Sequence, residues 1–183
     1  MSIAITIVTT ANRTLHFKQS DPTHVEEILS SLRRCNNLFT NRTLVVVSDT
    51  GTEVFSPRSI TRIEIQTDAD LSPYLPPAWE VSATVIGPGE VPPATKIDQN
   101  HVAARIDFFF EGGDTLSTWF ERKRPASVAD RAMQISRLFE QHILAYHMEK
   151  PGIGFMNPAT MTRASLGVSL DEAPAGAWQV KHA

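Results

Sequence analysis

Alternating apolar residues near the N-terminus constrain the fold of this chain more than any other feature. Ile3, Ile5 and Ile7 stand at every second position, which is the pattern of a strand with one buried face. Residues 11–13, Ala-Asn-Arg, are typical of a turn, and residues 14–18 return as a second strand. The chain is therefore predicted to begin with a β-hairpin.

A helix is predicted directly after this hairpin, over residues 20–35. Ser20 or Asp21 can accept hydrogen bonds from the first backbone N–H groups, and Pro22 suits the first turn. Apolar residues recur three and four positions apart along one side: Val25, Ile28, Leu29, Leu32 and Cys35. We therefore expect this helix to pack one face on a core.

Three short strands and a proline-rich connection follow the helix. The strands are expected over residues 43–48, 53–56 and 60–66. Residues 67–97 contain six of the 12 prolines in the chain, and proline cannot donate a hydrogen bond to a sheet. This segment is therefore interpreted as a connection, in which residues 81–86 are the one strand candidate.

The same order of elements recurs after the connection. A strand over residues 101–110, a Gly-Gly turn over 111–114 and a return strand over 115–121 form a second hairpin. A long amphipathic helix is predicted over residues 124–150. Its apolar stripe consists of Val128, Ala132, Ile135, Phe139, Ile143 and Tyr146.

These elements predict a single α+β domain over residues 1–150. We expect a mostly antiparallel sheet with two amphipathic helices on one face. The periodicity stops at Pro151, so residues 151–183 are predicted to be an irregular C-terminal tail. The charged strand positions expected to look outward or toward a partner are Arg62, Glu64, Arg105 and Asp107.

Asp49 raises the question of an aspartic protease, because Asp49-Thr50-Gly51 follows a run of valines. Such an enzyme needs two carboxylates that share one proton, and one Asp-Thr-Gly per chain would require a homodimer. The same residues also suit a tight turn between two strands, because Asp favours turns and Gly tolerates a positive φ. The turn is the preferred interpretation, and a dimeric aspartic protease stays an alternative.

No cofactor, metal site or catalytic residue is predicted. The sequence lacks the His-x-x-x-His and Cys-x-x-Cys spacings of zinc sites. It also lacks a Gly-x-Ser-x-Gly nucleophile elbow and a glycine-rich phosphate loop. Cys35, the single cysteine, falls on the apolar side of the first predicted helix, where cysteine behaves as a small hydrophobic residue. The pattern therefore leans away from an enzyme.

A basic cluster precedes the second predicted helix. Arg122, Lys123 and Arg124 are consecutive, and Arg131 follows one turn into the helix. Helix N-termini attract phosphate, and neighbouring cations strengthen that field. Adjacent Trp119-Phe120 would offer a stacking face for bases. A nucleic-acid-binding module is therefore an alternative function, although a basic turn of this kind is common on ordinary surfaces.

The overall charge and hydropathy point to a cytoplasmic protein without membrane association. The formal net charge is −3, which does not favour polyanions by bulk attraction. No apolar run approaches the roughly 18 residues of a transmembrane helix, and the N-terminus lacks the basic region of a signal peptide. A single cysteine fits a reducing compartment.

The leading functional expectation is a non-catalytic structural or interaction subunit. It would assemble through its tail and an exposed sheet face, as a homo-oligomer or within a larger protein assembly. The reason is that large apolar side chains lie in segments that have no core of their own. The expected interaction residues are Tyr74, Trp79, Phe155, Met156, Leu166, Leu170 and Trp178.

Overall fold

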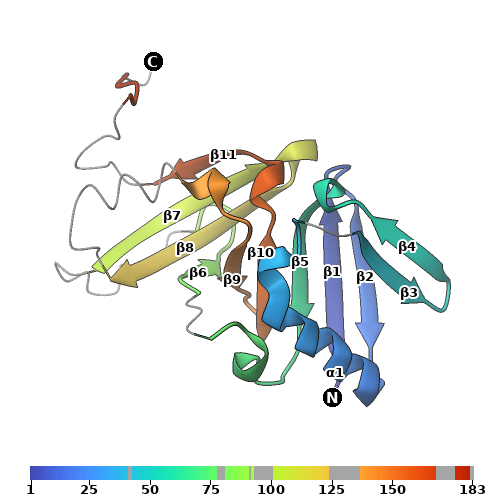
Figure 1. The fold of residues 1–183 in the computed structure, drawn as a ribbon. Coiled ribbons are helices and arrows are strands. Elements are labelled where there is room, and N and C mark those ends of the chain that lie inside the picture. The colour runs from blue at the N-terminus through green and yellow to red at the C-terminus, as the bar shows by residue number, and fades with distance from the viewer. Residues whose placement is uncertain are drawn as a thin grey trace.

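A mixed, mostly antiparallel sheet of nine strands forms the body of the protein in this computed structural model. The strand order is β11-β7-β8-β6-β9-β10-β5-β1-β2, and β6 and β9 are paired in parallel. The structure describes residues 1–40, 43–77, 81–90, 92, 101–123, 137–167 and 176–181. The predicted α+β class and the mostly antiparallel sheet are therefore confirmed (Figure 1).

The strands follow the predicted hairpins closely in the first half of the chain. The strands of the large sheet are β1 (Ile3–Thr9), β2 (Thr14–Gln19), β5 (Ile60–Gln66), β6 (Ala83–Val85), β7 (His101–Phe110), β8 (Thr115–Lys123), β9 (Leu144–His147), β10 (Gly152–Met156) and β11 (Met161–Leu166). A separate hairpin consists of β3 (Leu44–Ser48) and β4 (Gly51–Phe55). Short 3₁₀ turns connect several of these strands: η2 (Pro57–Ser59), η3 (Ser72–Tyr74), η4 (Glu111–Gly113), η5 (Leu138–Glu140) and η6 (Pro158–Thr160).

The helix after the first hairpin forms where the sequence predicts it. α1 spans Pro22–Ser31 and continues into the 3₁₀ segment η1, Leu32–Asn37. The Asp21 carboxylate accepts hydrogen bonds from the backbone N–H groups of Thr23 and His24, so the cap satisfies donors that the first turn leaves open. The apolar side of the helix is buried against the sheet at Val25, Leu29, Leu32 and Cys35.

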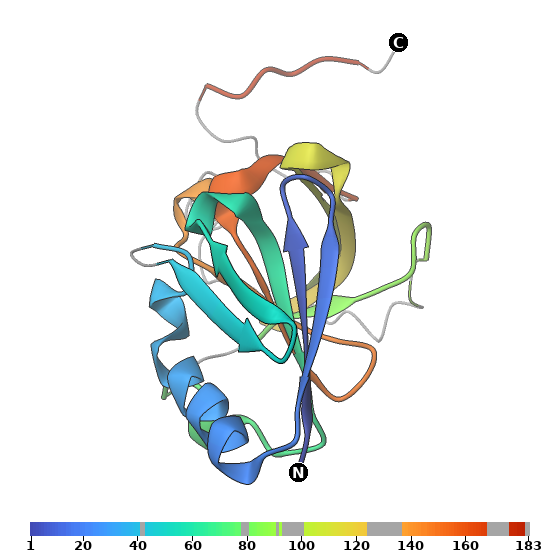
Figure 2. The ribbon, with the colours of Figure 1, turned by 90° about the vertical axis from the view of Figure 1, so that its right-hand side faces the viewer.

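Two hydrophobic cores lie on opposite faces of the sheet. On the first face, Ile7 and Ile63 of the sheet pack with Leu29 of α1 and Phe55 of β4. Figure 2 shows α1 and the β3–β4 hairpin together on this side of β1 and β2. Because side chains alternate between the two faces of a strand, every second residue of β1 and β5 points into this first core.

The second core lies where β7 and β8 fold across the opposite face of the sheet. Phe108 and Leu116, from β7 and β8, pack with Tyr146 of β9 and Met156 of β10. The side chains of β5 that alternate with Ile63 therefore face this second core rather than bulk solvent. This placement brings charged residues of β5 under the β7–β8 hairpin.

Gly112 allows the tip of the β7–β8 hairpin to meet the β1–β2 turn. Its φ is +79°, and a Cβ atom there would overlap the backbone carbonyl of Thr10. Glycine both adopts this conformation and leaves room for the neighbouring backbone. The predicted Gly-Gly turn over residues 111–114 is therefore confirmed, and it also joins two hairpins that are distant in the sequence.

The predicted second helix over residues 124–150 is wrong in its described part. Residues 124–136 lie outside the described residues, whereas Leu144–His147 forms strand β9. Tyr146, which the helical stripe would place on one side of a helix, is fully buried in the sheet. Residues 144–147 form a strand because their backbone pairs with β10 and β6. The sequence pattern does not reveal this strand, because four residues are too few to break an apparent helical period.

The predicted irregular tail starts too early in the sequence. Residues 152–156 form β10, which lies inside the sheet between β5 and β9, and residues 161–166 form the edge strand β11. Ile153 and Phe155 alternate with glycines rather than with polar residues, so the strand period is easily missed. Only after β11 do the described residues, 176–181, lack regular structure.

Candidate functional site

A polar cluster lies on the second face of the sheet, at the centre of the fold. Tyr146 of β9 and Glu64 of β5 both pair in register with Gly154 of the intervening strand β10. Because Gly154 has no side chain, the Tyr146 ring lies across it, and a Cβ atom there would overlap the ring. The Tyr146 hydroxyl thereby donates a hydrogen bond of 2.7 Å to Glu64 Oε1.

Arg62 joins this cluster to the β7–β8 hairpin. Its guanidinium donates to Glu64 Oε1, and its Nε donates to Asp114 Oδ2 at 2.9 Å. The Arg62 and Glu64 side chains are each 18% exposed, and the Asp114 side chain is 11% exposed. The cluster therefore consists of one cation, two carboxylates and a phenol in a partly dehydrated setting. The expectation that Arg62 and Glu64 look outward is wrong, because the curled sheet covers them.

The environment keeps the two donors of the cluster protonated. Burial, followed by the negative charge of Glu64, raises the pKa of Tyr146 well above its ordinary value. Burial disfavours the charged form of Arg62, but the hydrogen bond that Arg62 donates to Asp114 and the nearby negative charges outweigh burial and raise the Arg62 pKa. Tyr146 is therefore a hydrogen-bond donor in this cluster, and its bond to Glu64 links β9 to β5 across β10.

Tyr146 should give the protein a specific loss of stability at high pH. The pKa of Tyr146 is higher in the folded state than its unfolded value of about 10. The stabilisation from Tyr146 is therefore complete below about pH 10 and decreases as the pH rises above it. In Tyr146→Phe, the free energy of unfolding should fall less steeply with pH, by at most about 1.4 kcal/mol per pH unit. Urea unfolding between pH 8.5 and 11 measures this slope.

The other tyrosine of the chain supplies the control for this experiment. Tyr74 lies outside the sheet in η3, where its hydroxyl donates to Glu26 Oε2 at 2.7 Å. Tyr74→Phe should leave more of the high-pH slope in place than Tyr146→Phe does. Equal slopes in the two variants would contradict the assignment of this slope to Tyr146.

An open depression of about 270 Å³ lies beside the polar cluster. Residues from β1, β5, β6, β9 and the following turn line it: Ala4, Thr6, Glu64, Gln66, Val85, Tyr146, Met148, Glu149 and Lys150. Glu64 and Tyr146 are already hydrogen-bonded to each other there. The depression is shallow and mixed in character, so it lacks the enclosed apolar lining of a small-molecule site.

The outer side of the β3–β4 hairpin exposes an apolar surface. We call Val45, Val47 and Val54 the valine face; their exposed fractions are 52%, 76% and 61%. Val45 pairs directly with Val54, and Val47 pairs with Thr52, so these side chains lie on one side of the ribbon. No third strand pairs with either strand of this hairpin among the described residues. Residues 45–47 are all valine, so the sequence predicts strands here but not which side is exposed.

Asp49 and Thr50 form the turn of this same hairpin, between Ser48 of β3 and Gly51 of β4. Asp49 is exposed at the tip, and its neighbour Thr50 shares a hydrogen bond of 3.0 Å with Ser48. The preferred interpretation of Asp49 as a turn residue is therefore confirmed. Cys35 is buried, and its burial raises its pKa to about 11, as suits a packing residue and not a thiolate nucleophile.

The predicted basic cluster is only partly within the described residues. Arg122 and Lys123 end strand β8, whereas Arg124 and Arg131 lie outside the described part of the chain. Neighbouring residues of a strand point to opposite faces, so Trp119-Phe120 does not form one stacking surface. Nucleic-acid binding through this cluster stays a prediction.

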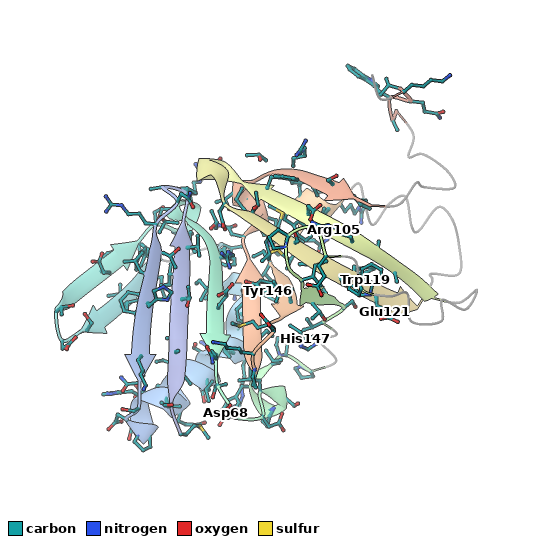
Figure 3. The ribbon with its side chains drawn as sticks, turned by 180° about the vertical axis from the view of Figure 1, so that it is seen from behind. Asp68, Arg105, Trp119, Glu121, Tyr146 and His147 are labelled. Atoms are coloured by element: carbon teal, nitrogen blue, oxygen red, sulfur yellow. The ribbon has the colours of Figure 1, made fainter. Side chains whose placement is uncertain are left out.

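The outer face of β7, β8 and β11 carries charges of both signs. Arg105 of β7 and Trp119 of β8, both labelled in Figure 3, pair in register. The Arg105 guanidinium contacts the Asp107 carboxylate at 2.9 Å. On the next strand, Arg163 lies over the Phe109 ring at 4.0 Å from its centre. This face is therefore locally balanced by ion pairs and aromatic contacts rather than uniformly basic.

The expected interaction residues are dispersed over the fold. Phe155 and Met156 are buried in the sheet at 0% and 1% exposure, so they have no surface for a partner. Tyr74 and Leu166 are half-buried, Trp178 is 93% exposed, and Trp79 and Leu170 lie outside the described residues. Trp178 is thus the most exposed of those members of the set that the structure describes.

The described residues contain neither a cluster of metal ligands nor a membrane-spanning helix. No group of three His, Cys, Asp or Glu side chains there lies close enough to hold a metal ion. No helix in that part of the chain is long and apolar enough to cross a membrane. No protein-family model matches the chain, and no curated protein or solved structure is significantly similar to it.

Proposed function

We propose that this chain is a non-catalytic assembly subunit that self-associates through the β3–β4 hairpin. The observation that carries the proposal is the valine face, where Val45, Val47 and Val54 are exposed at 52%, 76% and 61%. Single exposed apolar residues are common, but adjacent large ones in register on one ribbon are typical of a contact surface. The proposal involves no bond-making step and no cofactor.

The inner side of the same hairpin explains why the outer valines are not needed for the fold. Phe55 is buried in the first core, and Leu44 and Val46 pack against it. The hairpin is therefore already fixed to α1 and the sheet by one of its faces. Burying a valine contributes roughly 1.5–3 kcal/mol, so covering the valine face by another chain would favour association. In the described part of the chain no further strand pairs with the edges of the hairpin, so their outward N–H and C=O groups can pair with another chain.

Val47→Lys tests this proposal directly, because Val47 is the most exposed residue of the valine face. The parent protein should show an association that increases with concentration in sedimentation velocity. The variant should associate at least about tenfold more weakly, since a lysine cannot be covered by an apolar surface without losing its hydration. Its circular dichroism should match that of the parent.

Thr14→Lys is the matched control, because Thr14 is exposed on strand β2 of the large sheet. This variant adds the same charge at a strand position outside the valine face, so its association should equal that of the parent. A parent protein that stays monomeric at every concentration, or a Val47→Lys variant that associates as the parent does, would refute the proposed function.

A further inference from the structure

The segment after β11 presents a second exposed apolar surface. Trp178 and Val180 are 93% and 85% exposed, and they stand two positions apart in residues 176–181. In an extended chain, side chains two positions apart point to the same side. This segment can therefore offer a tryptophan and a valine together to a partner, with its own backbone N–H and C=O groups available for pairing.

The β3–β4 hairpin has complementary features. Its outer side is the valine face, and it pairs with no third strand in the described part of the chain. Its charged residues are Asp49 and Glu53, whereas the segment 176–181 carries Lys181 and no acidic residue. An extended peptide that adds to the free edge of a sheet gains affinity from backbone pairing and specificity from alternate side chains. The two surfaces match in apolar character, and the net negative charge of the hairpin favours the approach of the segment that carries Lys181.

The segment 176–181 and the β3–β4 hairpin lie on opposite sides of the molecule (Figure 1). Met161 of β11 pairs with Phe110 beside the hairpin tip, and Leu166 pairs with Ile106, so β11 runs away from the contact with the β1–β2 turn. β11 and β2 are the two opposite edge strands of the nine-stranded sheet. The hairpin lies on the β2 side of the molecule (Figure 1).

We propose that residues 176–181 of one copy dock on the β3–β4 hairpin of a second copy, with Trp178 and Val180 on the valine face. Strand β3 is the acceptor edge, because it carries Val45 and Val47, two of the three residues of that face. The inference rests on the proposed function and specifies its contact. The contact joins two different surfaces, so an exchange of segments between two copies makes two equal contacts.

Two variants of the full chain separate this contact from other forms of association. The tail variant, Trp178→Ala with Val180→Ala, keeps the hairpin. The hairpin variant, Val45→Thr, Val47→Thr and Val54→Thr, keeps the segment 176–181 and retains β-branched side chains that suit a strand. Each variant alone should associate about 30-fold or more weakly than the parent in sedimentation velocity, as for the loss of a central contact residue. Unchanged circular dichroism shows that both variants are folded.

A mixture of the two variants provides the decisive measurement. The tail variant supplies an intact hairpin and the hairpin variant supplies an intact segment, so together they retain one productive contact. A fluorescently labelled tail variant should therefore sediment faster when the unlabelled hairpin variant is added. No shift on mixing would overturn the inference. A tail variant that associates as the parent does would also overturn it, while leaving the proposed function in place, because valine faces would then pair directly. A monomeric parent would refute the proposed function itself.

Discussion

Gly154→Ala is expected to destabilise the protein by about 3 kcal/mol or more, because β10 has no room for a side chain at this position. A Cβ atom on Gly154 would overlap the ring of Tyr146, which is itself fully buried. The ring cannot move aside without losing its hydrogen bond to Glu64 and its place in the second core. Equilibrium unfolding in urea measures the difference in the free energy of unfolding.

Gly167→Ala is the control for this prediction, because a Cβ atom there would lie 3.5 Å from Arg105, at ordinary contact distance. It should change the stability by less than about 1 kcal/mol. A double-mutant cycle adds a sharper comparison. In a Tyr146→Ala background, Gly154→Ala should lose most of its effect, because the overlapping ring is absent. Additive effects of the two substitutions would show that the ring is not the cause.

Arg62→Met should destabilise the protein by about 2–4 kcal/mol, because it leaves two carboxylates facing each other without a cation. Glu64 and Asp114 both lose an ion-pair partner in this variant, and their side chains are only 18% and 11% exposed. The effect should be somewhat below that of breaking a wholly buried pair, because some water reaches the cluster. Urea unfolding at neutral pH measures it.

Two further variants separate the charge effect of Arg62 from its packing. Arg163→Met removes an exposed arginine that lies over Phe109, and it should cost less than about 1 kcal/mol. Combining Arg62→Met with Glu64→Gln and Asp114→Asn removes the unpaired charges, and this triple variant should regain much of the lost stability. A triple variant no more stable than Arg62→Met would show that packing, not charge, is lost.

Local patterns in the sequence are sufficient to predict the first half of the fold. The β1–β2 hairpin, α1 and β5 form where periodicity and capping residues predict them. The Asp21 cap, the Asp49-Thr50 turn and the Gly-Gly turn at Gly112 also follow from local chemistry. In each case the residues that specify the element lie within a few positions of one another, so a single sequence carries the information.

The candidate surfaces depend on contacts between distant residues, and the sequence does not reveal them in advance. Val45, Val46 and Val47 are chemically identical, and only the packing of the hairpin on α1 places Val46 inward and its two neighbours outward. The sequence predicts Trp178 as an interaction residue because it lies in a segment without periodicity, and the structure adds that its side chain is 93% exposed. Whether a given valine is buried or exposed depends on which face of its strand packs on the rest of the fold, and this is set only when the elements assemble.

The centre of the sheet shows the same division between local pattern and tertiary pairing. Tyr146 fits a helical stripe and Gly154 suggests a loop when each is considered along the chain alone. Side by side in β9 and β10, the tyrosine ring fills the space that the glycine leaves and reaches Glu64 on the third strand. The chain's hydrophobic periods specify hairpins and a helix through short-range geometry. The order of strands, and therefore the polar cluster, arises from long-range pairing that no local period encodes.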